Sequence, residues 1–355
     1  CVSACAIHQD VPEYIRLLAD GRYADALEVI YRNNALPAIT GHICDHQCQS
    51  NCTRLNYDGP LRIRDLKKLA LEQGWTEYRR RWHKPAGSGS RHPVAVIGMG
   101  PAGLSAGYFL ARAGHAVTLF EREASAGGVC GHIVPRFRLP EALVRHDIDF
   151  VAEHGVKFEY GCDPALTVDA LQAQGFEYVL VGIGADKSNV MAWEGGDARV
   201  HRALDFLRRY NLGERLDLGA HVAVVGAGNT AMDCARAALR VPGVKRVTVI
   251  YRRSRNEVPA FPEEYDEAVE DGVAFRFLTH PERFEPDGRL TCRVMALGAP
   301  DENGRRRPLP TEETVSLDVD ALITATGETA DAGVLAAIGV PLDDRGHPLV
   351  DPATG

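Results

Sequence analysis

The chain has 355 residues, of which 45% are hydrophobic and 25% charged, and its formal net charge is −8. This length predicts two or three domains with packed cores. An acidic balance without a long basic run argues against nucleic acid as a partner. No stretch of about 18 apolar residues occurs, so we expect no membrane-spanning segment. Because the chain opens at Cys1 rather than Met, we expect further residues upstream.

Residues 1–82 have the pattern of a helical region. Apolar residues recur every three or four positions in VPEYIRLLADGRYADALEVIYRNN and again in LRIRDLKKLALEQGW, which predicts amphipathic helices. No strand pattern interrupts them. The following residues 83–92 are rich in Gly, Ser and Pro and predict a linker.

Five of the nine cysteines gather in this helical region: Cys1, Cys5, Cys44, Cys48 and Cys52. Their C-x3-C and C-x3-C-x3-C spacings suit zinc or iron–sulfur ligation. Zinc sites favour C-x2-C pairs, which are absent here, so iron–sulfur is the favoured prediction over zinc or free structural thiols. Five thiolates exceed one four-ligand site and indicate parts of two clusters. Such thiols beside nucleotide motifs predict a reducing, cytoplasmic setting.

A strand–turn–helix–strand unit follows at residues 94–121. Gly98, Gly100 and Gly103 form G-x-G-x-x-G directly after an apolar strand, and Pro101 and Ala102 open the next helix. The first glycine permits a tight turn, the second admits a pyrophosphate, and the third lets the helix pack on the strand. The positive helix end then faces the phosphates. This context predicts a bound dinucleotide rather than a turn without a ligand.

The residues after this motif bear on which dinucleotide it takes. Glu121 ends the second strand, 23 residues after Gly98, where an acid can bond ribose hydroxyls. The segment ASAGGVCGHIVPRFRLP then resembles the flavin side of glutamate synthase small-subunit flavoproteins. The resemblance implies that Gly127 and Gly128 approach FAD. Arg138 there would meet a phosphate or the partner domain, or be a surface charge.

A second unit of the same plan spans residues 222–253. Gly226, Gly228 and Ala231 form G-x-G-x-x-A, and Ala keeps the close helix–strand contact. Asn229, Thr230 and Asp233 lie near the first helical turn, where they could position a cofactor. For Asp233 a purely local role in the helix is the alternative.

Two arginines replace the acid at the end of this second unit. Arg252 and Arg253 follow the strand where a ribose-binding carboxylate would stand. A carboxylate repels a 2′-phosphate, whereas a guanidinium pairs with it in bidentate fashion. This site is therefore predicted to prefer NADPH to NADH. The alternative is that both arginines are simply solvated at a strand end.

The order of these motifs resembles one family over essentially the whole chain. The cysteine-rich head, GPAGLSAGYFLARAGHAVTLFE, VPRFRLP, GNTAMD, YRRSRNEVPA and ALITATGE are similar to the glutamate synthase small subunit and to the N-terminal half of dihydropyrimidine dehydrogenase. ITGHICDHQCQSNCTRLNYDGPLRIRDLKKLA, ALDFLRRYN and TCRVMALGAPDENGRRRP are closer to the selenate reductase type of iron–sulfur flavoprotein subunit. Such subunits are thought to work with molybdenum-containing hydroxylase subunits.

The resemblance implies a fold class and domain bounds. We expect an α/β protein with two Rossmann-like nucleotide-binding domains behind an all-α iron–sulfur domain. The expected domains are the head at 1–82, an FAD domain at 93–195 plus 328–355, and an NADPH domain at 196–327. YVLVGIGAD and ALITATGE resemble the crossover strands, where Gly182, Gly184 and Gly327 let the backbone pass close to the cofactor. Relatives continue beyond the C-terminal residue, so the FAD domain is expected to be cut short.

The resemblance also divides the cysteines into two [4Fe–4S] sets. Cys1 and Cys52 would share one cluster with ligands upstream of the chain. Cys5, Cys44 and Cys48 would hold the other with a ligand that is not cysteine. Relatives place Gln or Glu where this sequence has Lys67, and a protonated lysine cannot be a ligand. Asp65 is the nearby candidate.

These features predict an oxidoreductase that passes electrons between NADPH, FAD and [4Fe–4S] clusters to a partner subunit or domain, with no catalytic side chain of its own. The selenate reductase type is the favoured interpretation, and a glutamate synthase small-subunit role is the alternative. A redox sensor or scaffold without turnover, and a zinc-stabilised binding module, are the alternatives of other classes.

Replacing Arg252 and Arg253 together by Glu should weaken NADPH binding at least about tenfold more than NADH binding, because the new carboxylates repel the 2′-phosphate. Dissociation constants for the two nucleotides, measured side by side, check this. Equal losses for both nucleotides would refute the assignment of these arginines.

Overall fold

The computed structural model describes residues 1–83, 92–164, 166–189, 191, 194–195, 199–302 and 304–351. The chain divides into two compact units, Cys1–Gly184 with Ala330–Gly355, and Ala185–Thr329. The sequence analysis instead placed the two points where the chain passes between the nucleotide-binding domains after residues 195 and 327. The expected linker at 83–92 lies outside the described residues except at its two ends. No described helix has both the length and the apolar character that a membrane crossing requires.

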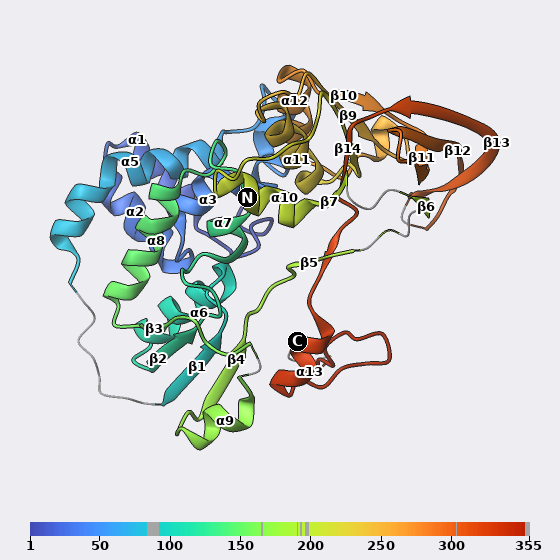
Figure 1. The fold of residues 1–355 in the computed structure, drawn as a ribbon. Helices are drawn as coiled ribbons and strands as arrows, with labels where there is room; N and C mark the ends of the chain where they lie inside the picture. The colour runs from blue at the N-terminus through green and yellow to red at the C-terminus, as the bar shows by residue number, and fades with distance from the viewer. Residues whose placement is uncertain are drawn as a thin grey trace. The chain divides into compact units, whose positions relative to one another are not determined.

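The head is helical, as its periodicity predicts, and residues 1–83 contain no strand. Its helices (Figure 1) are α1 (Val11–Ala19), α2 (Tyr23–Asn33), α3 (Pro37–Ile43), α4 (Gln47–Ser50) and α5 (Ile63–Arg81), with the 3-10 turn η1 (Thr53–Asn56) before α5. The Asp10 side chain caps α1 by accepting from the Glu13 N–H at 3.2 Å. Tyr14, Leu17 and Ile30 are buried in the core between the helices.

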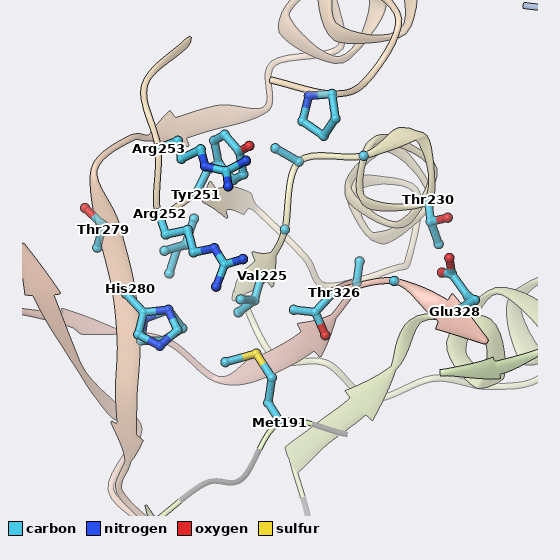
Figure 2. Close-up of a pocket in the computed structure, with 18 of the residues that line it drawn as sticks. Met191, Val225, Thr230, Tyr251, Arg252, Arg253, Thr279, His280, Thr326 and Glu328 are labelled. Carbon is cyan, nitrogen blue, oxygen red and sulfur yellow. The ribbon is translucent and has the colours of Figure 1, made fainter. Parts of the chain in front are cut away.

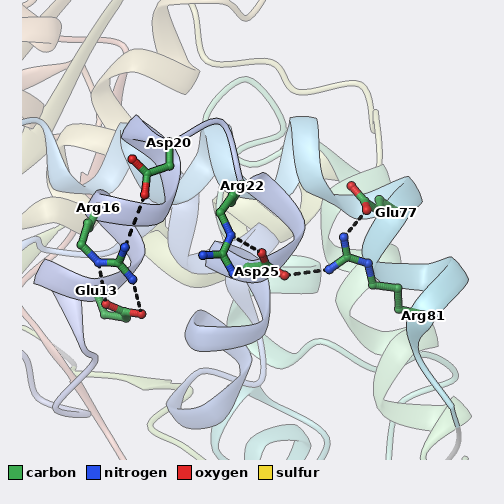
Figure 3. Close-up of polar contacts among 7 residues, drawn as sticks. All are labelled: Glu13, Arg16, Asp20, Arg22, Asp25, Glu77 and Arg81. Atoms are coloured by element: carbon green, nitrogen blue, oxygen red, sulfur yellow. Dashed lines mark hydrogen bonds and ion pairs between the residues drawn. The ribbon is translucent and has the colours of Figure 1, made fainter.

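Several ion pairs lie on the exposed side of these helices. Asp25 on α2 accepts from Arg22 at 2.6 Å and from Arg81 on α5 at 2.7 Å, and Arg81 also reaches Glu77. Figure 3 shows this chain of contacts beside a second set in which Arg16 bridges Glu13 and Asp20. Exposed pairs contribute little to stability, so the buried helix faces hold the head together.

A buried carboxylate is one of the contacts that join the head to the neighbouring α/β domain. Asp147 lies on α8 (Glu141–Glu153) and is fully buried. It accepts from the Ala38 N–H at 3.2 Å and from the Ile39 N–H at 2.8 Å, at the start of α3. Burial raises the pKa of this carboxyl, and the unpaired first-turn N–H groups of α3 stabilise its charge. The helix that ends just before Cys44 is thereby fixed to the domain.

That α/β domain is a four-stranded parallel sheet in the order β3-β2-β1-β4. The strands are β1 (Pro93–Ile97), β2 (Ala116–Phe120), β3 (Lys157–Glu159) and β4 (Tyr178–Val181), and the helices are α6 (Pro101–Arg112), α7 (Gly128–His132), α8, α9 (Val168–Ala173) and α13 (Ala332–Ile338). The C-terminal helix α13 returns to this sheet, and Ile338 packs with Ile97 and Leu171.

The second unit contains a five-stranded parallel sheet in the order β10-β9-β8-β14-β7. Its elements are β7 (Val200–Arg202), α10 (Ala203–Asn211), β8 (His221–Val225), α11 (Asn229–Leu239), β9 (Arg246–Ile250), η3 (Arg255–Glu257), α12 (Pro262–Glu270), β10 (Ala274–Arg276) and β14 (Ala321–Thr324). The alternation of apolar strands and helices that the sequence shows becomes a parallel sheet with short crossovers. The predicted fold class is confirmed.

A further sheet, mostly antiparallel, is inserted into this second domain. It contains the long hairpin of β12 (Arg289–Pro300) and β13 (Arg306–Asp318), with β11 (Thr279–Phe284) and β6 (Glu194–Gly195) beside it. Two short strands, β5 (Lys187–Ser188) and β15 (Glu328–Thr329), pair near the two crossings. Most of β13 is exposed, so its sequence lacks the sustained apolar alternation that predicts a strand.

We expect Asp147→Ala to destabilise the protein by about 3 kcal/mol, because two buried N–H groups lose their acceptor. Urea unfolding followed by tryptophan fluorescence measures the change. The control is Asp149→Ala on the exposed side of the same helix, which should leave the midpoint nearly unchanged. Equal midpoints for the two variants would show that Asp147 does not hold the head.

Candidate cofactor sites

The first glycine turn is built against the neighbouring strand. Gly98 follows β1 with φ +101°, and a Cβ there would lie 2.5 Å from the Gly182 carbonyl oxygen. A Cβ on Gly103 would lie 1.9 Å from the Gly98 oxygen. The chain's own packing therefore requires glycine at both positions. At Gly182 a Cβ would come no nearer than 3.4 Å to another atom, so packing does not require glycine there.

The middle glycine of this motif has a different environment. Gly100 has an ordinary extended backbone, with φ −74° and ψ −177°. A Cβ there would meet nothing nearer than the Gly128 Cα at 3.9 Å. The polypeptide itself does not demand glycine at this position, so the space in front of α6 fits a phosphate group that lies against the backbone. Pro101 and Ala102 form the first turn of that helix.

A second glycine pair closes one side of this space. Gly127 and Gly128 both have positive φ, and a Cβ on Gly128 would lie 2.7 Å from the Gly100 Cα. The structure thus places Gly127 and Gly128 beside the turn, and their predicted approach to FAD stays a prediction. Arg138 lies half-buried between α7 and α8, and its own N–H donates to the Pro135 oxygen.

Glu121 is buried beside the turn rather than extended from it. One carboxylate oxygen accepts from the Met99 N–H at 2.8 Å, and the other accepts from the Glu123 N–H at 3.1 Å. Each oxygen keeps a second lone pair, so the ribose role predicted from sequence stays compatible with this geometry. The carboxylate also stabilises the glycine turn itself, which the sequence did not indicate.

The second glycine turn repeats the plan of the first. Gly226 follows β8 with φ +121°, and a Cβ there would lie 2.1 Å from the Ala325 oxygen. Ala231 is fully buried against the strand. Around Gly228, by contrast, a Cβ would meet no atom within 4 Å. The open position again precedes a helix N-terminus, that of α11.

A cavity of about 480 Å³ lies in front of this turn. It is lined by Gly226, Gly228 and Thr230, by Arg252 and Arg253 after β9, and by residues from β11 and the second crossing, among them His280, Thr326, Gly327 and Glu328. Figure 2 shows both guanidinium groups reaching toward the turn from Val225 to Thr230, with Glu328 on the far side. The cavity is thus positive at one end.

The charges in this cavity suit an anion. The Nε atom of Arg253 is buried and has no hydrogen-bond partner among the described residues. Burial, and then the charge of Arg252, lower the pKa of His280, so its imidazole is neutral near pH 7. An unpaired buried donor is costly unless a ligand satisfies it. The residues present therefore fit a phosphorylated dinucleotide.

Not every residue singled out from the second motif faces this cavity. Asn229 accepts from the Phe261 N–H at 2.9 Å and so fixes the segment before α12. Asp233 is buried within α11 and does not line the cavity. Gly184, with φ +73°, ends the first unit at the crossing. The sequence reasoning missed His280 on β11 and Arg305 just before β13, which reach the cavity from segments distant in sequence. The GRRRP run was the available signal for Arg305.

The division of the head's thiols into two cluster sets stays a prediction, although Cys5, Cys44 and Cys48 lie near enough to one another to interact electrostatically. Burial, with the nearby Cys44 and Cys5, raises the pKa of the Cys48 thiol, and the same three cysteines act on Lys67. Backbone N–H groups of Leu61 and Arg54 lower the pKa of the Cys52 thiol, with a smaller effect of the N-terminal amine. All nine cysteines are free.

The cysteines of the head supply thiolates, the donors that hold iron–sulfur clusters. No group of three or more His, Cys, Asp or Glu among the described residues is arranged around one metal ion. A cluster holds its thiolates farther apart than an ion does, since they bind its separate iron atoms. Lys67 is 5% exposed and its pKa is lowered by burial. Asp65 pairs with Arg62 at 2.6 Å on the helix surface, and its side chain is 44% exposed.

Two glycine turns that each leave room for a diphosphate, one facing a cationic cavity, define a two-dinucleotide oxidoreductase fold. Residues 92–354 match the family model for pyridine nucleotide-disulphide oxidoreductases, and the chain belongs to this family. Residues 1–78 match the model for dihydropyrimidine dehydrogenase domain II with its 4Fe-4S cluster. These matches confirm an enzyme class and the cofactor types predicted from sequence, FAD, NADPH and [4Fe–4S].

Individual proteins with similar sequences are also oxidoreductases or their subunits by name. The "Putative oxidoreductase YgfK" of Escherichia coli K12 is 69% identical over 99% of this chain, which spans 34% of that protein. The NADP(+)-dependent formate dehydrogenase subunit beta of Moorella thermoacetica is 38% identical over the whole chain and 54% of its own length. The glutamate synthase [NADPH] small chain of Halomonas elongata is 32% identical over 98% of this chain and 77% of its own length.

Among solved structures, FprA from Mycobacterium tuberculosis in its His57Gln form superposes with a TM-score of 0.61 at 18% identity. The match covers 72% of this chain and 74% of that one. At this identity the likeness concerns the fold alone. The chain spans about a third to half of the first curated relatives it matches.

We expect Gly100→Ala and Gly228→Ala to fold normally, with stability losses below about 1 kcal/mol, because the chain leaves room for each Cβ. Each should lose dinucleotide affinity by about tenfold or more, since the methyl group occupies the phosphate space. Flavin content tests the first variant and NADP⁺ titration the second. Gly98→Ala, strained by its backbone, should instead unfold early; normal binding by Gly228→Ala would contradict the assignment.

Proposed function

We propose that this chain is an electron-transfer module that passes electrons between NADPH, FAD and [4Fe–4S] clusters to a partner subunit or domain. The observation that carries the proposal is the second turn, where Arg252 and Arg253 line a cavity beside an open glycine. The Arg253 Nε there has no hydrogen-bond partner among the residues that the structure describes. Two cysteine sets in the same chain supply a one-electron outlet.

The preference for NADPH rests on charge. No carboxylate stands directly after β9, at the position where an acid would bind the ribose. The three residues there are Tyr251, Arg252 and Arg253. A fork-shaped guanidinium pairs with a phosphate through two hydrogen bonds. The names of two relatives include NADPH: the NADPH-Fe(3+) oxidoreductase subunit beta of Geobacter sulfurreducens and the glutamate synthase [NADPH] small chain of Halomonas elongata.

The cofactors would supply the chemistry: nicotinamide delivers a hydride, flavin accepts two electrons, and a cluster takes them one at a time. The residues of the chain then have binding tasks. The glycine turns hold the diphosphates, Glu121 fixes the first turn, and the arginines select the nucleotide. None of the residues we assign needs to act as an acid or base.

The names and lengths of the relatives support the proposal of a partner. The chain spans only part of its first relatives, and two of those are named as beta subunits, so we propose that the electrons leave to another segment or subunit. The sequence of the head and of the segment GAPDENGRRRP resembles the selenate reductase type of subunit. We therefore favour that type, with a molybdenum-containing partner. The glutamate synthase role is the second candidate, supported by the small chain at 32% identity.

The setting we propose is the reducing cytoplasm, because thiolates that hold clusters must stay reduced. A sensor or scaffold would bind the same groups without turnover, and a zinc-stabilised module would contain neither iron nor sulfide. These alternatives differ from the proposal in what NADPH does to the protein.

Under anaerobic conditions, NADPH should bleach the flavin bands of the reconstituted chain and produce the EPR signal of a reduced cluster. NADH at the same concentration should react at least about tenfold more slowly. Unchanged flavin bands with full cofactor content would favour the scaffold, and a colourless protein that contains zinc would refute the cluster assignment.

A further inference from the structure

The β12–β13 hairpin brings a third arginine to the nucleotide cavity. Arg305 lies at the hairpin turn, next to Arg306 at the start of β13, and lines the cavity with Arg252 and Arg253. The turn fixes its backbone, because the Arg305 N–H donates to the Asp301 Oδ1 at 2.8 Å and the Asp301 N–H donates to the Arg305 oxygen at 3.0 Å. Arg305 therefore reaches the cavity from a defined turn.

The neighbouring arginine ties this turn to the loop that carries the other two. The Arg306 guanidinium donates to Glu257 Oε1, at 2.7 Å from Nε. Glu257 also accepts from the backbone N–H and the hydroxyl of Ser254, the residue directly after Arg253. The Ser254 and Arg306 contacts lower the pKa of Glu257, so it stays a carboxylate. Through this carboxylate the hairpin end and the arginine pair are held together.

The charge on the cavity wall is unbalanced at this end. Among the residues that line it, three are arginines and only Glu328 is acidic. Figure 2 places Glu328 across the cavity from Arg252 and Arg253. The diphosphate of a dinucleotide has the α11 helix end as its binding site. Three guanidinium groups beyond that turn exceed what the diphosphate needs and suit one further phosphate.

We propose that Arg305 is a specificity-determining residue that clamps the 2′-phosphate of NADPH together with Arg252 and Arg253. The inference rests on the proposed function, because it assumes that the second site takes a nicotinamide dinucleotide. It adds that part of the selectivity comes from the hairpin of the inserted antiparallel sheet, which lies outside the Rossmann-like sheet.

The test compares 2′,5′-ADP with 5′-AMP on the full chain with FAD and clusters in place. Both probes carry adenosine and a 5′-phosphate, and only the first carries the 2′-phosphate. Arg305→Ala should weaken 2′,5′-ADP about tenfold and change 5′-AMP by less than about twofold. Arg305→Lys should recover part of the loss, since a lysine keeps the charge without the fork.

The matched control is Arg307→Ala, which removes an exposed arginine two residues further along the hairpin and outside the cavity lining. It should bind both probes like the unaltered chain. If Arg305→Ala binds 2′,5′-ADP normally while the unaltered chain prefers it to 5′-AMP, the role of Arg305 is overturned and the NADPH proposal stands. If the unaltered chain does not discriminate between the probes, both the NADPH preference and this inference fail.

Discussion

A diphosphate can reach backbone N–H groups only where no Cβ stands between them, and both halves of this protein are built around that constraint. At Gly98 and Gly226 the backbone turns with positive φ so tightly that the next strand's carbonyl excludes any side chain. At Gly100 and Gly228 the protein leaves the space open. The first pair makes the turn, and the second pair leaves room for the ligand at a helix N-terminus.

What separates the two sites is the charge that follows the second strand. In the first domain Glu121 folds back onto the turn and accepts from the Met99 N–H. In the second, Arg252 and Arg253 face an open cavity, and the Arg253 Nε lacks a protein partner within the described part of the chain. The same backbone plan thus carries different charges in the two domains. In the first domain the acid stabilises its own loop, and in the second the arginines are placed to bind an anion.

The cysteine head is joined to the first domain by a buried interaction and not by the linker alone. Asp147 accepts from two N–H groups at the start of α3, the helix that ends just before Cys44. Aromatic rings from both parts, among them Tyr31 and Phe150 with centroids 4.8 Å apart, fill the same core. Electron transfer needs cofactors at fixed separations, and this interface gives the head a fixed position on the domain that holds the first turn.

The sequence by itself determined the helical head, both glycine turns and the arginine pair, because each depends on residues close together in the chain. The division of the thiols into two sets comes from the family resemblance and stays a prediction. Only the tertiary structure decided that Glu121 bonds the turn, that Asn229 anchors Phe261 and that Asp147 caps α3. Likewise, His280 and Arg305 join the cavity from β11 and the β12–β13 hairpin. Local patterns set backbone conformation through short-range sterics, whereas these contacts join segments far apart in sequence, which only the packed fold brings together.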